Sequence, residues 1–156
     1  MTVKVDIPAD GGSGIVVNQG GRFSGWGLAF FEGVPQFIYR QSDTPDAVLR
    51  LAADKALTAG SHVIEIRVAL DPVSASAADS NGRPPGRGGA AATLVIDGSV
   101  AAQGRINATP GPLFIFMYQG AAIGHSTGNA LVDDYVPPFA FDGRIESVQF
   151  DLAPRP

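Results

Sequence analysis

The feature that most constrains the fold is an alternation of apolar and polar side chains with a period of two residues. It is clearest between Ser61 and Leu70. One face of this segment carries His62, Ile64, Ile66, Val68 and Leu70, and the other carries Glu65 and Arg67. Successive side chains of an extended chain point to opposite faces, so the pattern predicts a half-buried antiparallel strand. The same alternation places His62 on the core side or at its rim.

A second segment, Phe23–Phe31, is apolar on both faces and is therefore predicted to be a central strand. Trp26, Leu28 and Phe30 share one face, while Ala29 and Phe31 share the other. Two short Gly-containing turns, Glu32-Gly33 and Asp97-Gly98, indicate hairpins. Further strands are predicted at Val3–Ile7, Ile15–Val17, Val34–Tyr39, Ala47–Leu51, Thr93–Ile96, Val100–Ile106, Leu113–Tyr118 and Phe139–Leu152.

The last predicted strand changes the parity of its apolar positions. Phe139, Phe141 and Ile145 are odd-numbered, whereas Val148 and Phe150 are even-numbered. A shift of one residue moves every following side chain to the opposite face. We therefore expect a β-bulge or a strand break near Glu146-Ser147.

The irregular segments complete an all-β prediction. Residues 71–90 are rich in Pro and Gly without an apolar period and predict a long flexible loop, and residues 120–138 are also irregular. No segment has the pattern of an amphipathic helix of ten residues. Gly 20 and Pro 12 in 156 residues suit many turns. We expect one domain over residues 1–156, with ten to twelve short strands in two packed antiparallel sheets.

Composition excludes several classes of function. The formal net charge of -4 argues against nucleic acid and anionic membranes as partners. Cysteine is absent, which excludes disulfides, thiolate catalysis and Cys-based zinc sites. No apolar stretch approaches the length of a membrane-spanning helix. The first ten residues lack the apolar core of a signal peptide, so the compartment stays open.

Catalytic constellations are poorly represented in the sequence. Glu32, Glu65 and Glu146 lie in separate segments, whereas glycoside hydrolysis needs two carboxylates on one surface. His125 and Ser126 are adjacent, but neighbouring side chains on extended backbone point apart. No Gly-x-Ser-x-Gly turn is present. We predict that the chain is not an enzyme.

Ligand-binding candidates are the aromatic residues and one histidine. Trp26, Tyr39, Tyr118 and Tyr135 could line a sugar-binding surface, since aromatic rings stack on the faces of sugar rings. The alternative for Trp26 is packing in or beside the core, because Leu28 shares its face. His125, in a Gly-rich loop, is either a ligand contact or a solvated loop residue.

A calcium site is the metal alternative. Asn129, Asp133 and Asp134 form an oxygen-rich loop of the kind that can hold Ca²⁺. No EF-hand spacing is present, and turn-forming, solvated acids are the simpler interpretation. The prediction is therefore no cofactor, with calcium as the alternative.

Five segments, in order along the chain, resemble the C-terminal domain of bacterial arylsulfatases. The first, Gly20–Leu28, is similar to a "GGRFGGWSLY" segment of that domain, and Ala59–Ile66 is similar to an "AGKHTLRFEF" strand. The others are Gly88–Gly98, similar to "GGTGTLYVDG", Gly104–Ile106, similar to "GRI", and Asp134–Val148, similar to "YxxPFxFTGTIEKV". The resemblance spans about Gly14 to Leu152 and implies a jelly-roll sandwich of the concanavalin A-like or laminin G-like kind.

Two departures from the family are informative. Where the family has "DVGxDTGxPV", this chain has Tyr118–Gly128, with the acids replaced, one of them by His125. The Cys/Ser-x-Pro-x-Arg motif that sulfatases convert to formylglycine is absent. The resemblance therefore implies an accessory domain that packs against a sulfatase catalytic domain. The alternatives are a carbohydrate-binding module with a glycan partner, and a free-standing structural protein that forms homo-oligomers.

Overall fold

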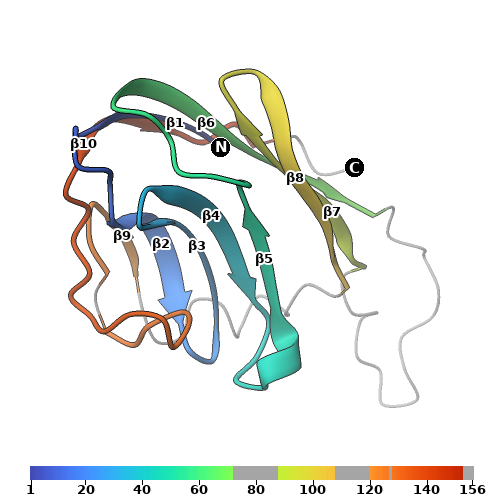
Figure 1. The fold of residues 1–156 in the computed structure, drawn as a ribbon. Coiled ribbons are helices and arrows are strands. Elements are labelled where there is room, and N and C mark those ends of the chain that lie inside the picture. The colour runs from blue at the N-terminus through green and yellow to red at the C-terminus, as the bar shows by residue number, and fades with distance from the viewer. Residues whose placement is uncertain (72–87, 108–119, 127, 153–156) are drawn as a thin grey trace, which may run out of the picture.

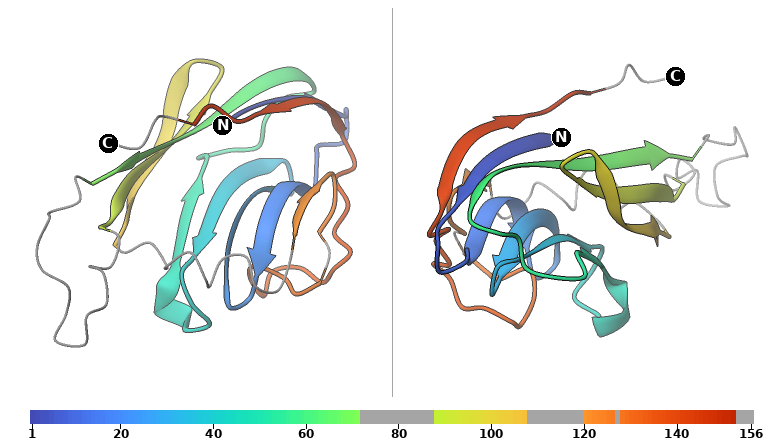
Figure 2. Two further views of the ribbon diagram at one scale, coloured as in Figure 1. Left: turned by 180° about the vertical axis from the view of Figure 1, so that it is seen from behind. Right: turned by 45° about the horizontal axis from the view of Figure 1, so that its top comes forward.

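The computed structural model contains two antiparallel β-sheets that face each other as two layers (Figures 1 and 2). It describes residues 1–71, 88–107, 120–126 and 128–152. Sheet A has the order β10-β1-β6-β7-β8, formed by Arg144–Gln149, Thr2–Ile7, Gly60–Leu70, Ala90–Ile96 and Ser99–Ile106. Sheet B has the order β5-β4-β3-β2-β9, formed by Val48–Ala52, Val34–Arg40, Ser24–Phe31, Gly14–Gly21 and Ala121–Ile123. A single 3-10 turn, η1 (Pro45–Ala47), precedes β5 within the described residues.

The two segments with the clearest sequence patterns form strands where the sequence predicts them. β6 spans Gly60–Leu70, and β3 is the central strand of sheet B, between β2 and β4. Both short turns join adjacent antiparallel strands. Glu32 and Gly33 have φ of 50° and 79°, and Asp97 and Gly98 have φ of 49° and 79°. Positive φ at both central residues suits the right-handed twist of the paired strands, which explains the glycine in each turn.

The bulge expected near Glu146-Ser147 is present. Lys4 on β1 is opposite Ser147, but the next residue, Val5, is opposite Ile145. Glu146 is thus the extra residue on β10. Its insertion lets Ile145 and Val148 both face the core in spite of their different parity.

The main core lies between the two sheets. Both sheets contribute alternating apolar side chains, and the largest wholly buried one is Phe30 on β3. The buried members are Val3, Val5, Ile7, Val16, Val17, Leu28, Phe30, Phe37, Leu51, Ile64, Ile66, Ala90, Ala92, Leu94, Ile106 and Phe141. This core fixes which face of sheet B is internal, so the opposite face is called the outer face below.

The outer face of sheet B is also covered. A second apolar cluster joins its side chains Ile15, Ala29 and Ile38 to Leu131, Val132 and Tyr135. Residues 129–139, here called the covering segment, run across this face (Figure 1). Tyr135 stacks on Phe139, with ring centroids 5.0 Å apart, and Phe31 lies against both rings. Sheet B is therefore buried on both sides, as the two apolar faces of β3 require.

Some strand predictions differ from the structure. The predicted strand Phe139–Leu152 is a strand only over Arg144–Gln149, because residues 139–142 turn past β2 and share one parallel bridge with Ile15. The short edge strand β9 falls in a segment predicted to be irregular. The predicted strand Leu113–Tyr118 and most of the predicted loop, residues 72–87, lie outside the described residues.

Candidate functional site

Two arginines on the outer face of sheet B form the base of the candidate site. Ile38 and Arg50 are register partners on β4 and β5, and Arg40 is paired with Val48. Because Ile38 belongs to the outer cluster, the alternation of side chains places Arg40 on the same face of β4. The two guanidinium groups therefore lie where the covering segment crosses the sheet edge.

Arg50 forms a two-bond ion pair with Asp134 of the covering segment. Arg50 Nη1 donates to Asp134 Oδ1 over 2.8 Å, and Nη2 donates to Oδ2. The side chains are 37% and 42% exposed. The hydrogen bond from Arg50, together with its charge, lowers the pKa of Asp134 in spite of partial burial, which works in the opposite direction. The pair joins residues 84 positions apart in the sequence.

Arg40 is buried and its head group is tied to backbone carbonyls. The residue is 5% exposed, Nε donates to the carbonyl of Leu131, and Nη1 donates to the carbonyl of Ser42 over 3.2 Å. Burial and the charges of Arg22 and Arg50 lower the pKa of Arg40, whereas Asp133 and Asp43 raise it. Arg40 thus binds a main-chain carbonyl of the covering segment, and Arg50 binds a side chain of the same segment.

A third arginine completes the group. Arg22, in the turn between β2 and β3, donates through Nη1 to Asp133 Oδ1 over 2.5 Å. This pair is more exposed, at 52% and 76%. Both aspartates of the covering segment are therefore paired with an arginine of sheet B or its turns.

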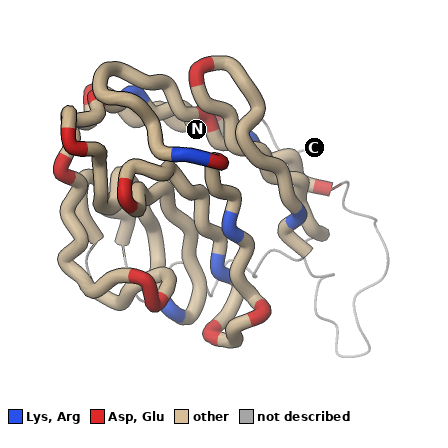
Figure 3. Tube along the Cα trace, viewed as in Figure 1, with Lys and Arg blue, Asp and Glu red and all other residues tan. Residues whose placement is uncertain are grey.

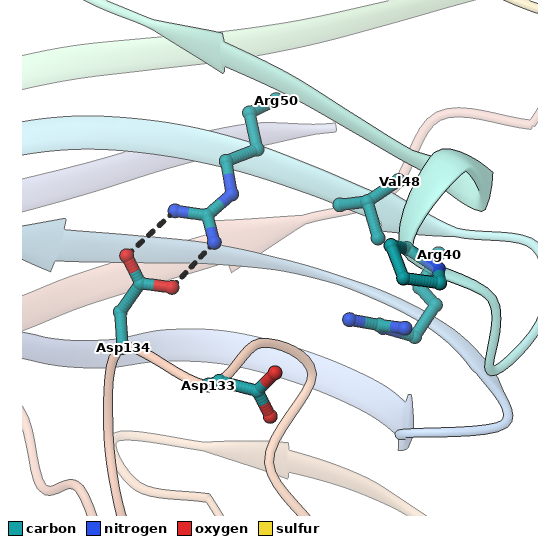
Figure 4. Close-up of a pocket in the computed structure, with 6 residues that line it drawn as sticks. Arg40, Val48, Arg50, Asp133 and Asp134 are labelled. Atoms are coloured by element: carbon teal, nitrogen blue, oxygen red, sulfur yellow. Dashed lines mark hydrogen bonds and ion pairs between the residues drawn. The ribbon is translucent and has the colours of Figure 1, made fainter.

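These side chains border an open pocket of about 440 Å³ on the outer face (Figure 4). Its wall combines charged groups with two apolar side chains, and the lining residues are Arg40, Pro45, Val48, Arg50, Asp133 and Asp134. Figure 4 shows the head groups of Arg40 and Asp133 directed into the space between β4 and the covering segment. The pocket, which we call the arginine pocket, is lined by four charged side chains and by the apolar side chains of Pro45 and Val48.

Trp26 and Tyr39, predicted as candidate sugar-binding residues, lie on the inner face of sheet B. They are register partners on β3 and β4, and both are partly buried against the main core. The Trp26 ring meets Phe150 edge-on, with centroids 5.9 Å apart. Burial raises the pKa of Tyr39 to about 12, and its hydroxyl has no hydrogen-bond partner in the described part of the chain. Neither residue borders the arginine pocket.

The remaining ligand-binding candidates are separated from one another. Tyr135 is 7% exposed, and its hydroxyl accepts a hydrogen bond from the Leu131 amide over 2.9 Å. His125 is exposed in the turn after β9. Tyr118 lies outside the described residues. The structure thus makes Tyr135 part of the outer apolar cluster and does not bring the predicted aromatic residues together.

Two of the three predicted calcium ligands are held in ion pairs. Asp133 and Asp134 each pair with a different arginine, and Asn129 is exposed at the start of the covering segment. Across the described ranges, no group of three or more His, Cys, Asp or Glu side chains is arranged to hold a metal ion. The ion pairs give both carboxylates a structural partner.

A separate polar cluster surrounds His62, near the start of β6, the central strand of sheet A. Its Nδ1 lies 2.7 Å from Asp97 Oδ2, and its Nε2 lies 2.9 Å from the carbonyl oxygen of Thr58. Asp97 Oδ1 also accepts a hydrogen bond from the Val63 amide. Burial lowers the pKa of His62, but these hydrogen bonds and the Asp97 charge outweigh it, so the pKa is raised overall. The histidine lies at the rim of the core, as the alternation predicts, and fastens the β7–β8 turn.

Sequence reasoning missed Arg22, Arg40 and Arg50. The available signal was two isolated arginines at outward positions of otherwise apolar strands, combined with the adjacent acids Asp133 and Asp134. A buried arginine requires acceptors, so such positions indicate an acidic or carbonyl-rich segment across the sheet.

Comparison with known proteins assigns this chain to no family. No protein-family model matches this chain, and no curated protein sequence does so. The relation to arylsulfatase C-terminal domains therefore stays a prediction that depends on the sequence motifs. In the described part of the chain, no helix is long and apolar enough to cross a membrane.

Proposed function

We propose that this chain is a non-catalytic β-sandwich module that packs against a partner domain. The module is of the concanavalin A-like, jelly-roll kind that the arylsulfatase resemblance implies, and its partner is a sulfatase catalytic domain. The observation that carries the proposal is an apolar surface at one end of sheet A.

This surface, here called the end strip, has two parts: Val68 and Leu70 on β6, and Phe150 and Leu152 after β10. Both parts lie past the same end of β1, because Thr2 is opposite Glu65 on one side and Gln149 on the other. Val68 and Leu70 have the same parity on β6 as buried Ile64 and Ile66, so they continue the core-facing side of the sheet. Their exposed fractions are nevertheless 46% and 62%, and those of Phe150 and Leu152 are 49% and 88%. Figure 1 shows the end of β6 running out past the strands of sheet B.

Burial of this strip against a protein surface is favoured over its exposure to water. Burying apolar area contributes about 25 cal/mol per Å², and contiguous exposed apolar patches usually mark interaction sites. Elsewhere along the described chain, acidic and basic residues are interspersed, as the Cα trace of Figure 3 shows, and the other exposed large apolar side chains are Phe23, Val100, Ile123 and Val136. An apolar strip beside such a mixed surface is typical of an interface between domains.

The proposed module contributes no reacting group of its own. The sequence has neither cysteine nor the Ser-x-Pro-x-Arg form of the formylglycine motif. We therefore expect that the purified chain releases no sulfate from a nitrophenyl sulfate ester.

The test begins with the coding region and its neighbours. The proposal requires a sulfatase catalytic domain, with its formylglycine motif, in the same or an adjacent reading frame, and its absence from both would overturn the proposal. Where it is present, the two parts are expressed separately, and their association is measured by analytical ultracentrifugation. The double variant Leu70→Gln, Leu152→Gln is expected to weaken association about tenfold or more.

Val100→Gln is the matched control. Val100 is similarly exposed, at 58%, but lies on β8 near the β7–β8 turn, whereas Leu70 is opposite Ala90 at the other end of β7. This variant should associate like the unchanged chain. Equal weakening by both variants would contradict the assignment of the interface to the end strip.

A further inference from the structure

A second binding site is carried by the arginine pocket, on the outer face of sheet B. We propose that it binds a neutral, polyhydroxylated ligand, a sugar, through two adjacent hydroxyl groups. The argument depends on the charge balance of the pocket, on its unused hydrogen-bonding atoms and on its apolar wall.

The charge balance favours a neutral ligand. Arg40 and Arg50 line the pocket together with Asp133 and Asp134, so the lining itself carries two positive and two negative side chains. Beyond the lining, Arg22 is paired with Asp133, and the charge of Asp43 also acts on Arg40. A sulfate, a phosphate or an ammonium group would each meet as many repelling as attracting charges.

The unused polar atoms of the pocket include a donor on Arg40 and an acceptor on Asp133. Arg40 donates hydrogen bonds from Nε and Nη1 to backbone carbonyls, and its Nη2 has no protein acceptor among the described residues. Asp133 Oδ1 accepts a hydrogen bond from Arg22, and its Oδ2 has no donor among the described residues. Since both head groups face the same space in Figure 4, they can serve one ligand.

This pair of atoms matches a vicinal diol. One hydroxyl accepts a hydrogen bond from the guanidinium, and its neighbour donates one to the carboxylate. Arg40 is held by Leu131 and Ser42, and Asp133 by Arg22, so both are oriented before the ligand arrives. Pro45 and Val48 supply an apolar wall for the C–H face of a sugar ring.

The site is distinct from the aromatic residues that sequence reasoning proposed for sugar binding. Trp26 and Tyr135 are engaged in the inner and outer apolar clusters, whereas the arginine pocket is open to solvent. It is also separate from the end strip. Failure of either proposal therefore leaves the other standing.

The experiment is an NMR titration of the whole chain with methyl glycosides of glucose, galactose and mannose, and with galactose 6-sulfate. Signals of the Arg40 and Arg50 Nε–H groups and of the 131–135 amides should shift with a neutral glycoside in the millimolar range. Binding of the sulfated sugar alone would overturn the assignment of a neutral ligand. No shift with any probe at tens of millimolar would overturn the site.

Variants separate direct hydrogen bonding from general electrostatics. Asp133→Ala is expected to weaken binding about tenfold, because it removes the acceptor. Asp133→Asn retains an oxygen acceptor without the charge and should have an intermediate effect, which also guards against misfolding of the alanine variant. Asp43→Ala is the matched control, since Asp43 acts on Arg40 only through its charge and does not line the pocket. Equal loss in the Asp43 and Asp133 variants would contradict the proposed contact.

Discussion

Arg50 on β5 donates two parallel hydrogen bonds to Asp134, and this pair connects the edge of sheet B to the segment that covers its outer face. Asp134→Asn keeps the shape of the side chain but removes its charge. Since both side chains are more than a third exposed, we expect a loss of about 0.5–1 kcal/mol in the free energy of unfolding. Hydrogen exchange should become faster at the 131–135 amides in particular.

Glu146→Gln is the control for this variant. Glu146 also pairs with an arginine, Arg144, but two residues away on the same strand, so the pair joins no separate elements. Its loss should change neither the stability nor the exchange pattern measurably. A uniform increase in exchange over the whole chain in Asp134→Asn would show that the pair does not act locally.

Gly27 on β3 lies directly beneath the covering segment. A Cβ atom built there would lie 2.8 Å from Leu131 Cδ1, 3.0 Å from Asn18 Cβ and 3.1 Å from the Val17 carbonyl oxygen. Gly27→Ala should therefore force Leu131 away from the sheet and destabilise the protein by about 1–3 kcal/mol in chemical denaturation. Gly120→Ala, where no atom lies within 4 Å of the added Cβ, should be close to neutral.

Two tyrosines offer a comparison of a satisfied hydroxyl with an unsatisfied one. The Tyr135 hydroxyl accepts from the buried amide of Leu131, so Tyr135→Phe leaves that amide without an acceptor and should cost about 1–3 kcal/mol. The Tyr39 hydroxyl is buried without a partner among the described residues, so Tyr39→Phe should be neutral or stabilising. Thermal unfolding of both variants checks the order, and a larger loss in Tyr39→Phe would contradict it.

The parts of the fold that the sequence predicts are those governed by local geometry. Alternation over Ser61–Leu70 defines β6, the Asp97-Gly98 turn defines the β7–β8 hairpin, and the change of parity after Ile145 locates the bulge at Glu146. Each depends on residues close together in the sequence. The two apolar faces of Phe23–Phe31 also predict a central strand, which β3 is in sheet B.

The covering segment itself could not be predicted, because it has no periodic backbone of its own. Leu131, Val132 and Tyr135 are buried by the sheet that they cover, not by a regular element to which they belong. The arginine pocket could not be predicted for a similar reason. Asp133 and Asp134 resemble turn-forming acids until the fold brings them to Arg22 and Arg50, and the latter contact spans 84 residues.

The His62–Asp97 pair makes stability depend on pH in a defined window. The pKa of His62 is raised, so its stabilising contribution is complete below the ordinary value of about 6.5 and is lost as pH rises through the raised pKa. The pKa of Asp97 is lowered in spite of burial, which alone would raise it, because the Val63 amide and His62 both bond the carboxylate. Its contribution is present above about 3.8 and is lost as pH falls through the lowered pKa. Both contributions act together between these two ordinary values.

NMR titration of the His62 ring protons provides the measurement. We expect a pKa above 6.5 in the unchanged chain and a lower one in Asp97→Asn, which keeps an oxygen acceptor for Val63 but removes the charge. Denaturation at several pH values should show the unchanged chain losing about 0.5 kcal/mol, relative to His62→Gln, as pH rises from mildly acidic to mildly alkaline. The small size follows from Asp97, whose side chain is 50% exposed. A His62 pKa below its ordinary value would mean that burial outweighs the pair and would reverse the direction of this pH dependence, and an unchanged pKa would abolish it.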